Sequence, residues 1–137
     1  MLVGQNPGRE EVRQHRPFVG RSGKYLNQVL RKKGIDRDTL YLTCVVKAPT
    51  PGNRKPTADE IRHWMPHLVR EIKKVAPEIV VLMGRVAWQA PRFEDIQYIE
   101  TYHPAAAMRF PEVRRRFERD METLRRRMQR RDGFREG

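Results

Sequence analysis

The segment 79–83 constrains the fold of this chain more than any other part of the sequence. It reads Ile-Val-Val-Leu-Met, contains no polar residue, and is followed by Gly84. A strand that is apolar at every position is buried on both faces, which is typical of parallel sheets covered by helices. Additional strands are predicted by three segments rich in apolar or β-favouring residues, namely 1–3, 40–46 and 96–102.

Helices are expected between these strands. Ser22 is expected to cap a helix that stops at Gly34. Thr57 and Glu60 have the spacing of a capping box, which begins a helix that Pro77 ends. The remaining segments are a short helix over 85–90, a long helix from 111 to about 131, and loops over 9–23 and 48–56. Strands that alternate with helices predict an α/β fold with three α/β/α layers and a four-stranded parallel sheet.

The long C-terminal segment combines an apolar stripe with many arginines. The stripe repeats every three or four residues and is expected to face the core; it consists of Val113, Phe117, Met121, Leu124 and Met128. The basic tail, 129–137, is expected to fray. A chain of 137 residues is long enough for one core, so residues 1–137 are expected to form a single domain.

The composition bears on partners and location. A formal net charge of +12 favours polyanions, nucleic acid first, although a merely solvated arginine-rich surface has the same composition. Cys44 is the one cysteine, so neither an internal disulfide nor a multi-cysteine metal site is expected. No apolar run approaches the roughly 20 residues that cross a bilayer, and no signal peptide is recognised. We therefore expect a cytoplasmic, nucleoid-associated monomer without a membrane partner.

Polar residues follow several of the predicted strands. Gln5 and Asn6 come after the first strand, Cys44 ends the second, and His103 follows the last. The carboxyl ends of parallel strands open on one edge of the sheet, so these residues are expected to converge on a pocket. Asn6 could position a water molecule, and His103 could donate a hydrogen bond to an anion on a leaving group. Cys44 lies in an apolar strand and is expected to be packing rather than a nucleophile.

Five motifs together carry a family resemblance. They are Gly-Gln-Asn-Pro-Gly at 4–8, Arg-Pro-Phe-Val-Gly-Arg-Ser-Gly at 16–23, Tyr-Leu-Thr-Cys-Val-Val-Lys at 41–47, Pro-Gly-Asn-Arg-Lys-Pro at 51–56 and His-Pro-Ala-Ala at 103–106. In this order they resemble the uracil-DNA glycosylase superfamily, and its type 4 branch in particular, over residues 1 to 128. The resemblance implies a pocket for a flipped base and hydrolysis of the N-glycosidic bond in DNA.

The resemblance also implies roles for individual residues. Phe18 would stack on uracil, and His103 would stabilise the uracil anion through its O2 atom. Gln5 would contact the base, and Glu11 would place a carboxylate beside it. The loop that enters the duplex would contain Ala105, Met108 and Arg109, with Met108 or Arg109 as the wedge. Arg54 and Lys55 would bind DNA.

Three departures from the type 4 pattern matter. That branch holds a four-iron, four-sulfur cluster on four cysteines; two of these positions are Ala48 and Trp64 here, the other two precede the first motif, and no cofactor or metal is expected. Cys44 replaces an asparagine that reads uracil, and a thiol does this poorly. Asn6 replaces a small residue, and other branches use asparagine in this position to orient the attacking water.

The expected function is a monofunctional DNA glycosylase of base excision repair that removes a deaminated base, uracil first. One alternative is the same fold with changed base specificity, for hypoxanthine, xanthine or a mismatch. Another is a catalytically silent DNA-binding or adaptor protein.

Overall fold

The computed structural model describes residues 1–136, and their side chains as far as Arg130. Its centre is a four-stranded sheet in the order β2-β1-β3-β4, in which each neighbouring pair is parallel. The strands are β1 (Leu2–Gly4), β2 (Leu42–Cys44), β3 (Ile79–Met83) and β4 (Gln97–Thr101). The predicted four-stranded parallel sheet is thereby confirmed.

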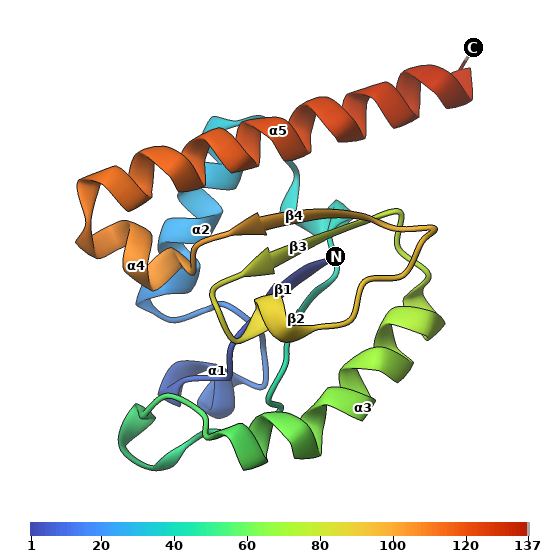
Figure 1. The fold of residues 1–137 in the computed structure, drawn as a ribbon. Coiled ribbons are helices and arrows are strands. Elements are labelled where there is room, and N and C mark those ends of the chain that lie inside the picture. Colours follow the sequence, from blue (N-terminus) through green and yellow to red (C-terminus); the bar gives the residue numbers. More distant parts are fainter. Residues whose placement is uncertain (137) are drawn as a thin grey trace.

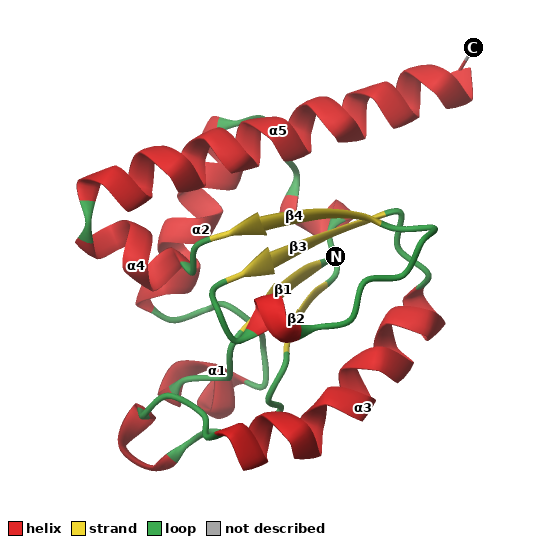
Figure 2. Ribbon diagram, viewed as in Figure 1, coloured by secondary structure: helices red, strands yellow, loops and turns green. Residues whose placement is uncertain are grey.

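Helices cover both faces of the sheet (Figures 1 and 2). In chain order they are α1 (Arg9–Gln14), α2 (Arg21–Lys32), α3 (Ala58–Val75), α4 (Pro104–Arg109) and α5 (Pro111–Glu136). Short 3-10 turns occupy Arg37–Thr39, Pro51–Asn53 and Ala87–Gln89. Figure 1 shows α3 on one side of the sheet and α2, α4 and α5 on the other.

Two hydrophobic layers hold these helices against the sheet. On one face Val81 of β3 belongs to the same cluster as Leu26 of α2 and Phe117 of α5. On the other face Val80 lies in a cluster with Leu68 of α3. Consecutive β3 side chains therefore face opposite layers, which explains why the segment contains no polar residue.

The predicted helix boundaries are confirmed where the signals are local. Thr57 caps α3 by accepting a hydrogen bond from the Glu60 amide, and Glu60 accepts one from the Thr57 amide. In α5 the predicted stripe faces the core, with Phe117, Met121 and Leu124 buried. The helix continues to Glu136; the expected frayed tail, 129–137, lies at this end, and Gly137 is outside the described residues.

Three local predictions are wrong. The segment 105–109, expected to be the loop that enters the duplex, lies in the helix α4. The expected loop over 9–23 contains α1, whose first turn is closed by a hydrogen bond from the Gly8 amide to the Glu11 carboxylate. Ser22 does not cap α2, because the helix begins one residue earlier and Gly20 is its cap residue. The Gly20 amide instead donates to Glu11, a contact between segments that helical spacing does not reveal.

None of the helices in the described residues is both long and apolar enough to cross a membrane.

Candidate active site

A cavity of about 920 Å³ opens at the carboxyl ends of the strands. It is lined by nearly all of the residues predicted to form the site, namely Gln5, Asn6, Glu11, Phe18, Cys44, His103, Ala105, Met108 and Arg109. Arg54 and Lys55 are not among its lining residues. Segments separated by about 100 positions in the sequence thus contribute to one pocket, as the parallel topology predicts.

His103 occupies the junction between β4 and α4. It is the cap residue of α4, and its Nδ1 atom accepts a hydrogen bond from the Ala105 amide at 3.1 Å. Burial lowers the pKa of His103 from 6.5 to about 4, so the ring is neutral at neutral pH. A neutral imidazole that accepts at Nδ1 carries its proton on Nε2. His103 can therefore donate from Nε2 to a group in the cavity.

The ends of β3 and β4 that precede His103 are held by Trp88. Its indole N–H donates to the carbonyl oxygens of Leu82 and Thr101, at 3.1 and 2.9 Å. Gly84 has a φ of 96°, and a Cβ atom there would lie 3.2 Å from the Cβ atom of His103. A glycine at this turn thus allows His103 to pack closely beside the end of β3.

Phe18 forms a wall of the cavity opposite His103, with 6.5 Å between the two ring centroids. The residue is only 6% exposed, and its φ of 52° lies in the left-handed region. Two glycines make room for it. A Cβ atom on Gly4 would lie 2.6 Å from the ring, and one on Gly23 would lie 2.1 Å from the Phe18 carbonyl carbon.

Arg37 fixes the backbone around Phe18, a role that the sequence analysis missed. Its guanidinium donates to the carbonyl oxygens of Phe18 at 3.0 Å and Pro17 at 2.5 Å. A further bond at 2.5 Å goes to the side-chain oxygen of Asn27 in α2. Arg37 therefore ties the strained turn to the helix behind it.

Glu11 joins the two loops that flank the cavity. One carboxylate oxygen accepts from the Gly8 amide at 3.0 Å, and the other accepts from the amides of Val19 and Gly20, at 2.8 and 2.5 Å. Charge-assisted bonds of this kind are about twice as strong as neutral ones. Glu11 thus holds the first motif against the second, and its contact with a base stays a prediction.

Cys44 ends β2 beside the phenyl ring of Phe18. A Cβ atom on Gly4 would touch both the Phe18 ring and, at 3.6 Å, the Cys44 sulfur. Burial raises the pKa of Cys44 to about 12, so the side chain is a protonated thiol. A thiol in this state is a poor nucleophile, in agreement with the expectation of packing.

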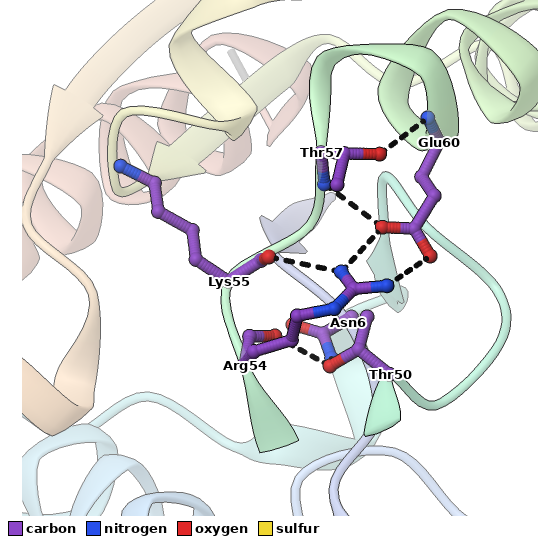
Figure 3. A network of polar contacts seen from close by, with 6 residues as sticks. All are labelled: Asn6, Thr50, Arg54, Lys55, Thr57 and Glu60. Carbon is purple, nitrogen blue, oxygen red and sulfur yellow. Dashed lines mark hydrogen bonds and ion pairs between the residues drawn. The ribbon is translucent and has the colours of Figure 1, made fainter. Parts of the chain in front are cut away.

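Asn6 follows β1 and is half-buried in the cavity wall. Its side-chain nitrogen donates to the Thr50 hydroxyl at 3.3 Å (Figure 3). Gln5 lies beside it, and the Gln5 carbonyl accepts from the Val46 amide at 3.0 Å. The first motif is thereby fastened to the segment that continues from β2.

The rim of the cavity is basic. Its cationic lining residues are Arg9, Arg16, Arg21, Lys47 and Arg109, against the acidic Glu10 and Glu11. Lys47 donates to Glu71 at 2.7 Å. Burial alone would raise the pKa of Glu71, but hydrogen bonds from Lys47, Tyr41 and Thr43 outweigh burial and lower it. The remaining cations can attract phosphate groups to the rim.

The predicted DNA-contact residues are held in different ways. The Arg54 guanidinium pairs with Glu60 at 2.7 Å, whereas Lys55 is exposed (Figure 3). Arg114 of α5 donates to the Met108 carbonyl at 2.9 Å and so stabilises the end of α4. Arg109 is exposed at that end, at the rim of the cavity.

The iron–sulfur cluster of the type 4 pattern does not fit the side chains found here. Ala48 and Trp64 offer no thiolate, and Trp64 packs against the core layer beneath α3. Among the described residues there is also no group of three or more His, Cys, Asp or Glu side chains placed to hold a metal ion.

Comparison with known proteins agrees with this geometry. The sequence matches the model of the uracil DNA glycosylase superfamily over residues 1–125, which include every strand and every residue that lines the cavity. The Type-4 uracil-DNA glycosylase of Sulfurisphaera tokodaii is 35% identical over 91% of this chain and 68% of its own length. The Type-4 uracil-DNA glycosylase of Archaeoglobus fulgidus is 31% identical over 90% of this chain and 74% of its own length. A DNA polymerase of Bacillus phage SP01 is 31% identical over 90% of this chain but 15% of its own length. The chain belongs to the uracil DNA glycosylase superfamily.

Proposed function

We propose that this protein is a monofunctional DNA glycosylase that hydrolyses the N-glycosidic bond of uracil in DNA. The observation that carries the proposal is the convergence of Asn6, Phe18 and His103 on one cavity with a basic rim. Binding DNA alone does not require an aromatic wall, a neutral imidazole donor and a carboxamide in the same pocket. Base excision at such a site has a use for each of them.

Each group has a defined part in the reaction. Phe18 stacks on the flipped base, and Asn6 orients a water molecule toward C1′ of the deoxyribose. The water oxygen forms a bond to C1′ while the bond from C1′ to the base nitrogen breaks, and its electron pair moves onto the base. His103 donates a hydrogen bond from Nε2 to the oxygen on which that negative charge accumulates. The water proton passes to solvent, and the product is an abasic site.

The proposal is tested with oligonucleotides that contain a single uracil. The protein is incubated with single- and double-stranded substrates, and abasic sites are then cleaved with alkali. We expect a shorter, labelled product from uracil and none from a matched thymine oligonucleotide. Absence of product from uracil, hypoxanthine and xanthine substrates would refute the proposal and favour a silent DNA-binding protein.

Cys44 motivates a second candidate, the same reaction with altered base specificity. A partly buried thiol replaces an amide that could both donate to and accept from the edge of the base. Sites that pair fully with a polar group discriminate far better than sites that do not. The Cys44 environment therefore permits removal of deaminated bases other than uracil.

Cys44→Asn is expected to raise the preference for uracil over hypoxanthine and xanthine by about tenfold or more. The new amide can pair with the edge of uracil, whereas the purines present a different edge. The measurement is the ratio of kcat/KM values on matched oligonucleotides. An unchanged substrate profile would show that this position does not read the base.

Arg37→Met is expected to lower kcat/KM by about tenfold, mainly through a higher KM, because two carbonyl anchors of the Phe18 turn are lost. Steady-state kinetics on the uracil oligonucleotide measure the effect. Arg31→Met is the matched control, since it removes the same charge from an exposed position of α2. Equal losses in both variants would point to charge rather than to the turn.

The basic rim supports DNA as the substrate, and two of the relatives carry the name Type-4 uracil-DNA glycosylase. Monomeric state, nucleoid location and a single domain over 1–137 stay predictions.

A further inference from the structure

Thr50 contacts the side chain of Asn6 and lies in the loop between β2 and α3 (Figure 3). The residue is only 6% exposed, and its hydroxyl has two neighbours. The Asn6 side-chain nitrogen lies 3.3 Å from the Thr50 oxygen. The carbonyl oxygen of Arg54 is the second neighbour. The site motifs of the sequence do not include Thr50.

The Thr50 hydroxyl has a single proton, and this fixes the orientation of the Asn6 side-chain amide. A carbonyl oxygen can only accept, so the single hydroxyl proton of Thr50 is donated to Arg54. The Thr50 oxygen can then only accept from Asn6. This requires the NH2 end of the Asn6 amide to face Thr50 and leaves the Oδ1 end for the cavity.

The backbone around Asn6 is held by hydrogen bonds and by the proline that follows. The carbonyls of Gly4 and Gln5 accept from the amides of Val45 and Val46, at 3.1 and 3.0 Å. Pro7 restricts the backbone of the residue before it to extended conformations. With the backbone held, the side-chain amide can still rotate, and the hydrogen bond to Thr50 opposes that rotation.

The loop that contains Thr50 is itself fastened to α3. Arg54, which accepts the Thr50 proton at its carbonyl, pairs through its guanidinium with Glu60 at 2.7 Å. Glu60 also caps α3 by accepting from the Thr57 amide at 2.8 Å. Figure 3 shows this continuous network from Asn6 to the beginning of the helix.

We propose that Thr50 is a positioning residue, which holds the Asn6 carboxamide with Oδ1 toward the cavity so that this oxygen accepts a hydrogen bond from the attacking water. The inference rests on the proposed glycosylase function. Among the described residues, no protein group donates to Asn6 Oδ1, so this oxygen is available to water. With the amide reversed, the site would present a donor where the water needs an acceptor.

Thr50→Val tests this role because it keeps the shape of the side chain and removes the hydroxyl. We expect the single-turnover rate constant for uracil release to fall on the order of tenfold, with unchanged half-saturating enzyme concentration. Thr50→Ser restores the hydroxyl and is expected to recover most of the rate. Thr123→Val is the matched control. The Thr123 hydroxyl also donates to a carbonyl, that of Arg119 within α5 at 3.2 Å, and Thr123 does not line the cavity.

A double-mutant cycle separates positioning from general destabilisation. If Thr50 acts through Asn6, Thr50→Val should have no further effect on the rate in an Asn6→Ala background. A tenfold loss in both backgrounds, or full activity of Thr50→Val in the parent, would overturn the inference. Neither result would touch the proposed function, which fails only if the parent protein releases no base.

Discussion

Asn6→Ala is expected to reduce the rate of uracil release by about 10²-fold, the cost typical of losing the position of a reacting group. The alanine leaves the cavity without the carboxamide oxygen that orients the water in the proposed mechanism. The half-saturating enzyme concentration should change little, because the aromatic wall and the basic rim are intact. Single-turnover assays with a uracil oligonucleotide measure both quantities.

Binding to an uncleaved oligonucleotide serves as the control for Asn6→Ala. Its dissociation constant, measured by fluorescence anisotropy at a fixed salt concentration, should equal that of the parent. A variant that binds less tightly and releases uracil at the parental rate would assign Asn6 to DNA binding instead.

His103→Asn is expected to lower the rate by about 10²–10³-fold, the usual cost of one donor to a developing anion. Asparagine is chosen because it is also a good helix cap, so the bond from the Ala105 amide can be kept while the imidazole is lost. The measurement is again the single-turnover rate, with the melting temperature as a test of folding.

The pH dependence gives a second readout for His103. Burial holds the pKa of His103 at about 4, below its usual 6.5, so the ring stays neutral as the pH falls through the range where an exposed histidine would protonate. We therefore expect no inflection near pH 6.5 in the parental rate profile. An inflection there, absent from His103→Asn, would show that the catalytic ring titrates normally.

Most of the strands and helices could be predicted because the sequence signals for them are local. The apolar run 79–83 and the Thr57–Glu60 capping box each define an element from adjacent residues. The convergence of Asn6, Cys44 and His103 then follows from parallel topology alone, since parallel strands end at one edge.

The rest of the site depends on contacts between distant residues. Thr50 and Asn6 are 44 positions apart, and Arg37 and Phe18 are 19 apart, without a spacing pattern that links either pair. The six residues of α1 are too few to show helical periodicity, and its first turn depends on Glu11. Polar side chains that support a site are therefore not predicted from periodicity and capping signals.

The anchoring of the two central groups has a consequence for the enzyme as a whole. Asn6 is connected through Thr50 and Arg54 to α3, on one face of the sheet, whereas His103 begins α4, which Arg114 fastens to α5 on the other. In the proposed mechanism, the separation between the water and the departing base is thus set by how both outer layers sit on the sheet between them. A substitution in the hydrophobic interior that shifts either layer would then misalign two groups that lie on different elements and share no hydrogen bond.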